Sequence, residues 1–255
     1  MCRLAAYLGP KIALSEILYE PPHSLEHQSY AAGELLFGNV NVDGTGVAWW
    51  DGQAPEPLRY VTAEPPWKDA NLPALAPRIR STSIIAAVRS ATPGLPFGTG
   101  NVAPFVSGGL AAVHNGWIGK FRGTVGRAMI ATLPDDLYRS LDVMNDSKAL
   151  FLMVVNHHSG DLADAVRMAV REVEALVRDQ GSSAALNLVV GDGSRIVATR
   201  HSANVGVNSL YTSSREGAQL LASEPLDDGD DWKPVPERHL IEVTAESLTI
   251  TPLET

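Results

Sequence analysis

The chain has 255 residues, 45% of them hydrophobic, with 29 acidic against 20 basic side chains and a net charge of −9. This balance excludes the basic surface that nucleic-acid binding needs, and no apolar run approaches the ~20 residues of a membrane span. The single cysteine excludes an internal disulfide and any zinc site with several cysteine ligands. Pro10 interrupts the short apolar start, which is unlike a signal peptide, so we expect a soluble cytoplasmic protein.

Four strands are expected in the first half of the chain, at 3–9, 46–52, 82–90 and 108–116. The apolar run 82–90 is typical of a strand buried on both faces. Two of these strands end in polar residues: Arg89 closes one, and His114, Asn115 and Gly116 close the other. Functional groups often lie where a buried strand stops, so these residues are candidates for a site.

Apolar spacings of three and four predict helices at 146–158 and 160–181. Asp161 marks the start of the second helix and Gly181 its end. The tail predicts a hairpin over 185–200, turning at Asp192-Gly193, and four short strands at 209–214, 218–223, 239–245 and 247–253. Strands, two helices and strands again indicate one α+β domain over 1–255, with sheets packed on helices.

Cys2 directly follows the initiator methionine. If Met1 is removed, Cys2 carries a thiol and a free α-amine, which together supply a nucleophile and a base within one residue. The reference pKa of an α-amine, roughly 7.7–8.0, suits proton transfer near neutral pH. The alternative is that Cys2 is a small buried hydrophobe.

Each other candidate also has a purely structural interpretation. Asn115-Gly116 could form a hairpin turn, Asp146 could be the N-cap of its helix, and Arg89 could be a surface charge. The acidic run 227–231 is expected to be a solvated loop. The adjacent histidines 157 and 158 point in different directions on a helix, so we expect no metal site there.

Several motifs, taken in order, resemble the class II glutamine amidotransferase family of N-terminal nucleophile hydrolases: "MCR", "NVDGTGVAWW", "VRSAT", "HNG" and "NDS". "PPHSLEHQSYA" and "LASEPLDDGDDWKPVPERHLIEV" are similar to the family's ergothioneine-pathway branch, which cleaves γ-glutamyl hercynylcysteine sulfoxide. The resemblance covers nearly the whole chain. It implies a four-layer αββα sandwich of two stacked, mainly antiparallel sheets.

The resemblance also implies catalytic roles. Cys2 would attack the γ-amide carbonyl once Met1 is gone. The Asn115 side-chain amide and the Gly116 backbone N–H would hold the oxyanion, where losing one donor typically costs about 10²–10³ in rate. Glycine suits this position because no Cβ stands between its N–H group and the substrate.

For the glutamyl group, the resemblance implies that Arg89 binds the carboxylate as a planar fork and Asp146 binds the ammonium. Thr92 would add a hydroxyl or main-chain contact, and His114 and Trp117 are counted as substrate-binding neighbours. If the leaving amine bears a trimethylammonium, aromatic faces could hold it, with Trp117, Trp49 and Trp50 as candidates; the alternative is that these tryptophans belong to the core.

Three functions remain open. The first is a γ-glutamyl amide hydrolase whose released amine is the product. The second is a glutaminase subunit that supplies ammonia to a separate synthase partner. The third is a non-catalytic binding module. No cofactor or metal is expected, and the sequence leaves a homo-oligomer open.

Overall fold

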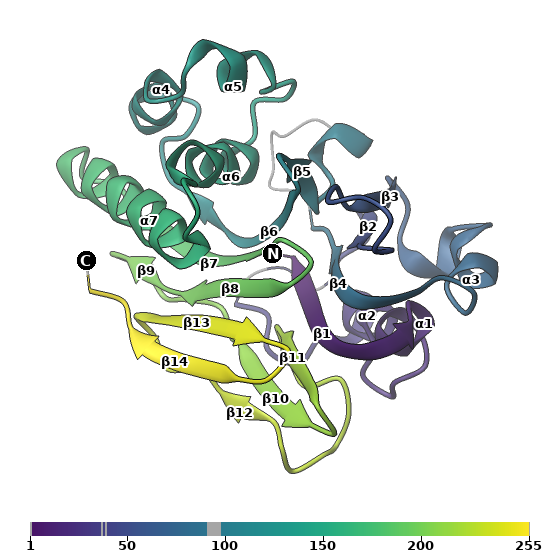
Figure 1. Ribbon diagram of the computed structural model, residues 1–255. Coiled ribbons are helices and arrows are strands. Elements are labelled where there is room, and N and C mark those ends of the chain that lie inside the picture. The colour runs from purple at the N-terminus through teal and green to yellow at the C-terminus, as the bar shows by residue number, and fades with distance from the viewer. Residues whose placement is uncertain (1, 37, 39, 91–97, 255) are drawn as a thin grey trace.

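The computed structural model describes residues 2–36, 38, 40–90 and 98–254 (Figure 1). Within these residues the chain forms two sheets in which every strand pair is antiparallel. The first sheet has the strand order β12 (Lys233–Pro234), β10 (Tyr211–Arg215), β11 (Ala218–Ala222), β1 (Arg3–Ala13), β4 (Arg80–Val88), β2 (Thr45–Trp49) and β3 (Leu58–Thr62). The second has the order β14 (Leu248–Pro252), β13 (His239–Thr244), β8 (Arg195–Arg200), β7 (Ala184–Gly191), β6 (Leu110–Ile118) and β5 (Phe105–Ser107), with β9 (Ser202–Ala203) paired to β7.

Helices cover the outer face of each sheet (Figure 1). Buried apolar side chains of α1 (Ser15–Leu18), α2 (Leu25–Ala31) and α3 (Leu72–Leu75) pack with those of β1 and β4 in the first sheet. The second sheet packs under α4 (Thr124–Ala131), α6 (Asp146–His157) and α7 (Leu162–Asp179). The remaining helical segments are α5 (Asp135–Arg139), η1 (Pro66–Lys68) and η2 (Thr99–Asn101).

A third apolar cluster lies between the two sheets, and we call it the inter-sheet layer. It takes alternate residues from the central strands, including Leu4, Ala6, Leu8, Ile85, Ala87, Ala111 and Val113. Alternation in a strand sends neighbouring residues to opposite faces, so each central strand contributes to this layer and to one helix-covered face. The four layers confirm the expected αββα sandwich.

The predicted helices at 146–158 and 160–181 are confirmed, as is the hairpin across Asp192-Gly193. Two expectations are wrong. His114, Asn115 and Gly116 do not end a strand or form a turn, because β6 continues to Ile118 and pairs with β7 along this whole stretch. The N-cap of α6 is Asn145, whose side chain accepts backbone hydrogen bonds, and Asp146 is the first residue of the helix itself.

No helix within the described residues is long and apolar enough to span a bilayer.

Candidate active site

The register of the first sheet brings Cys2 and Arg89 to the same point. In the antiparallel pair of β1 and β4, Arg3 lies opposite Val88. The residue before Arg3 is Cys2 and the residue after Val88 is Arg89, so the two are neighbours one step beyond the ladder. Continuing the strand alternation turns both side chains toward the inter-sheet layer, on the face of Leu4 and Ala87. Cys2 is half-buried there.

Arg89 is buried, with 5% of its surface exposed, and its guanidinium is only partly used. Nη1 donates a long hydrogen bond of 3.3 Å to the Asp43 carbonyl, and Nη2 has no partner within the described part of the chain. The backbone beside it is fixed, because Arg89 N–H donates to the Gly44 carbonyl at 2.8 Å. Gly44 has φ +140°, and a Cβ there would lie 2.5 Å from Val102 Cγ2. A buried guanidinium with a spare donor fits a carboxylate ligand.

Asn115 reaches the same end of the layer from the second sheet. It follows Ala111 and Val113 on the inter-sheet face of β6 and is fully buried. Its Nδ2 donates to Ser223 Oγ at 3.2 Å, and the same oxygen accepts Leu4 N–H at 3.0 Å. Leu4 is two residues from Cys2. One serine therefore joins the Asn115 amide to the start of β1.

The backbone of Gly116 faces an edge of β6 that no described strand covers. β5 pairs only with residues 110–112. Ile118 N–H points to this edge, where it donates to Asp146 Oδ2 at 2.9 Å. Alternate N–H groups of a strand point the same way, so Gly116 N–H faces this edge too. The structure also gives another reason for glycine, since a Cβ would lie 1.9 Å from the Ala185 carbonyl oxygen.

His114 lies on the opposite face of β6 from Asn115 and points into the helix layer. Nε2 is 2.8 Å from the Ala185 carbonyl, which can only accept, so Nε2 carries the hydrogen. Burial lowers the pKa of His114 although the Asp146 carboxylate opposes this, which favours the neutral ring at about pH 7. Nδ1 then accepts from Ser147 Oγ at 2.9 Å. Both ring nitrogens are used, in contrast to the expected substrate contact.

The hydrogen bond between His114 and Ser147 holds the first turn of α6 beside the open edge of β6. Ser147 N–H donates to Asp146 Oδ1 at 2.9 Å, while Oδ2 accepts Ile118 N–H. The Asp146 carboxylate is half-buried and held from two sides near Gly116. Its orientation therefore depends on His114 and Ser147. Thr92, also expected here, lies outside the described residues.

The three tryptophans that were candidates for an aromatic contact lie in different surroundings. Trp117 is half-buried and shares the face of Asn115 in β6. Trp50 is 6% exposed within the inter-sheet layer, and its Nε1 donates to the Pro55 carbonyl. Trp49 pairs with Ile84, four residues from Val88, which is roughly 13 Å along the strand. Trp49 and Trp50 thus lie away from Cys2 and Arg89, and Trp117 stays the candidate for an aromatic contact with the substrate.

Sequence reasoning missed the partners of Arg3 behind the candidate site. Arg3 is fully buried, its Nε donates to the Cys2 carbonyl at 2.9 Å, and its Nη1 pairs with Glu224 at 2.7 Å. Glu224 also accepts backbone N–H bonds from Gly33 and Glu34, which ties the segment after α2 to the start of β1. The available signal was position: Arg3 interrupts the apolar start of the chain, and a buried charge needs a partner.

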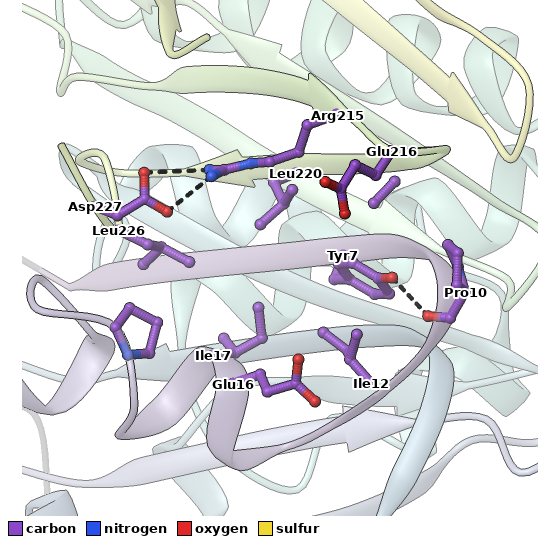
Figure 2. Close-up of a pocket in the computed structure, with 12 residues that line it drawn as sticks. Tyr7, Pro10, Ile12, Glu16, Ile17, Arg215, Glu216, Leu220, Leu226 and Asp227 are labelled. Atoms are coloured by element: carbon purple, nitrogen blue, oxygen red, sulfur yellow. Dashed lines mark hydrogen bonds and ion pairs between the residues drawn. The ribbon is translucent and has the colours of Figure 1, made fainter. Parts of the chain in front are cut away.

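A separate hollow of about 310 Å³ lies on the outer face of the first sheet, between β1, α1 and the β10–β11 hairpin (Figure 2). It contains none of the candidate catalytic residues. The Tyr7 hydroxyl donates to the Pro10 carbonyl at 2.5 Å, and burial raises the pKa of Tyr7 to about 12. Arg215 pairs with Asp227 at 3.0 Å and with Asp231 at 3.2 Å. The acidic run is a loop, as expected: residues 228–230 are exposed, while Asp227 and Asp231 are half-buried beside Arg215.

No cluster of three or more metal-ligating side chains occurs within 2–36, 38, 40–90 and 98–254. His157 instead pairs with Glu172, with His157 Nε2 at 3.1 Å from the carboxylate.

Comparison with known proteins first defines the class. A glutamine aminotransferase class-II domain protein from Silicibacter pomeroyi superposes with a TM-score of 0.75 at 24% identity, over 100% of this chain and 100% of that one. The fold is thus that of the class II glutamine amidotransferase domain. No protein-family model matches the chain.

Curated relatives narrow the assignment. A Mycobacterium tuberculosis protein named gamma-glutamyl-hercynylcysteine sulfoxide hydrolase is 35% identical over 254 residues, covering 100% of this chain and 97% of that protein. A Saccharomyces cerevisiae protein named probable glutamine amidotransferase is 26% identical, covering 99% of this chain and 84% of that protein. The chain belongs to the family of the gamma-glutamyl-hercynylcysteine sulfoxide hydrolases and is an amidohydrolase. The non-catalytic alternative is therefore set aside.

Proposed function

We propose that this amidohydrolase cleaves a γ-glutamyl amide bond with Cys2 as its nucleophile, releasing glutamate and an amine. The proposed substrate is γ-glutamyl hercynylcysteine sulfoxide, which the name of the M. tuberculosis relative supports. Removal of Met1 is part of the proposal, because only then does Cys2 carry a free α-amine.

The reaction would proceed through two covalent steps. The Cys2 thiol gives its proton to the α-amine and its sulfur attacks the γ-carbonyl carbon. Asn115 Nδ2 and Gly116 N–H donate hydrogen bonds to the resulting oxyanion. The protonated amine returns the proton to the leaving nitrogen as the C–N bond breaks, which leaves a γ-glutamyl thioester. Water, activated by the same amine, then attacks the thioester and releases glutamate and the thiol.

The observation that supports this proposal most is the state of Arg89. Its Nη2 is buried and has no partner among the described residues, one register step from Cys2. A buried unpaired donor is costly, so the arrangement favours a ligand that supplies an acceptor. A glutamate α-carboxylate supplies it, and the half-buried Asp146 carboxylate suits the α-ammonium.

A glutaminase that passes ammonia to a synthase partner is the second candidate, favoured by the similarity to the yeast protein named as an amidotransferase. Glutamine and γ-glutamyl hercynylcysteine sulfoxide, compared side by side with glutamate release as the readout, distinguish the two. We expect a higher kcat/KM for the sulfoxide. Faster turnover of glutamine, further increased by a co-purifying synthase, would instead establish the ammonia donor.

A further inference from the structure

We propose that Asn208 is a positioning residue that fixes the Asn115 amide with its N–H₂ group toward the reacting carbonyl. The inference rests on the proposed function, because Asn208 acts only through Asn115. It concerns a chain of buried amides between the sheets, in which Asn208 contacts Asn115, and Asn115 contacts Ser223.

The orientation of Asn208 follows from a single unambiguous acceptor. One terminal atom of its amide lies 3.0 Å from the Asn115 backbone carbonyl oxygen. That oxygen can only accept, so the atom must be the amino group Nδ2, whichever way the amide is turned by its other neighbours. The donor end of Asn208 is thereby assigned.

The orientation of Asn115 then follows. The same Asn208 Nδ2 lies 3.2 Å from a terminal atom of the Asn115 side chain, and this atom must accept, so it is Oδ1. Asn115 Nδ2 therefore points the other way, where Ser223 Oγ accepts one of its hydrogens. The amide has two such hydrogens, and the second is left for the oxyanion. With the opposite orientation, two amino groups would face each other in a site without solvent.

Asn208 is itself held firmly. Its backbone carbonyl accepts hydrogen bonds from Asn187 Nδ2 at 2.9 Å and from Arg200 Nε at 3.0 Å. Asn187 lies directly opposite Asn115 in the pairing of β7 with β6. Asn115, Asn187 and Asn208 are each 0% exposed. A fixed donor in a fixed position is what preorganises an oxyanion hole, because no reorientation is then required during the reaction.

The test is a double-mutant cycle on kcat. Asn208→Asp replaces the donor by an acceptor of the same shape, so the Asn115 amide should turn round. We expect kcat to fall about 10²–10³-fold, as for the loss of one oxyanion donor, with KM unchanged. Asn208→Ala removes the donor without adding charge and should lower kcat less. In an Asn115→Ala background, neither change should lower kcat further.

Asn204→Asp is the matched control, because it adds the same charge four residues away on an exposed side chain that bonds to the Ser182 carbonyl. We expect wild-type kcat and KM there. Thermal unfolding identifies the folded variants, and if Asn208→Asp does not fold, the cycle is run with Asn208→Ala. An equal fall in kcat with and without Asn115, or wild-type kcat in a folded Asn208 variant, would overturn this inference. Wild-type kcat in Asn115→Ala would instead refute the oxyanion role in the proposed function.

Discussion

Replacing Arg89 by alanine should raise KM steeply, because most of the donor groups of its guanidinium are available for a substrate carboxylate. Within the described residues, the Arg89 guanidinium donates one long hydrogen bond to the Asp43 carbonyl, and its Nη2 has no partner. A carboxylate bound by both nitrogens would gain two charge-assisted hydrogen bonds, each contributing about 1.5–3 kcal/mol. Their loss amounts to about 3–6 kcal/mol, which is roughly a 10²–10⁴-fold rise in KM at tenfold per ~1.4 kcal/mol.

Steady-state kinetics of glutamate release, with the hercynyl substrate and with glutamine, measures this effect. Arg89→Lys keeps the charge without the planar fork and should give an intermediate KM. Arg80→Ala is the control, since Arg80 lies at the other end of β4 and its exposed guanidinium donates to the Lys11 carbonyl. A KM for folded Arg89→Ala that is indistinguishable from the control would refute the assignment of Arg89 to the carboxylate.

Three further predictions concern other residues. Cys2→Ala should abolish turnover while glutamate still binds, as measured by calorimetry; residual turnover would assign the nucleophile elsewhere. Trp117→Ala should raise KM for the trimethylammonium substrate more than for glutamine, since cation–π attraction contributes about 0.5–2 kcal/mol, and equal changes would remove Trp117 from the pocket. Because burial lowers the pKa of His114, the unfolded chain binds a proton below about pH 6.5 that the folded chain does not, and stability should decline as pH falls. Urea denaturation of His114→Gln at about pH 7 and about pH 5 should show a smaller decline than wild type, and an unchanged decline would contradict this assignment.

The family resemblance carried by the motifs implied the four-layer sandwich, and apolar periodicity predicted strands and helices because it reports on burial. The long helices and the hairpin at Asp192-Gly193 have bounds close to those that the apolar spacing predicted. The polar triplet from His114 to Gly116 was misread as a strand end, because polar residues usually mark a loop. Here the three residues continue the strand opposite β7, and the side chains of His114 and Asn115 find hydrogen-bond partners inside the protein.

The contacts between the residues behind the candidate site could not be found from the sequence, because they join distant segments. Asn208 contacts Asn115 at a sequence separation of 93 residues, and Glu224 contacts Arg3 at a separation of 221. Asn187 did leave a signal, as a lone amide within the apolar strand 184–191. A buried polar side chain in such a strand indicates a hydrogen-bond partner, but not which one.

The most direct measurement is the intact mass of the protein, recorded alone and after acid quenching during turnover. If Cys2 supplies the sulfur nucleophile and its α-amine accepts the proton, active protein should lack Met1. The quenched sample should then carry one glutamyl group on Cys2. Active protein that retains Met1, or a glutamyl adduct mapped to any other residue, would contradict the account.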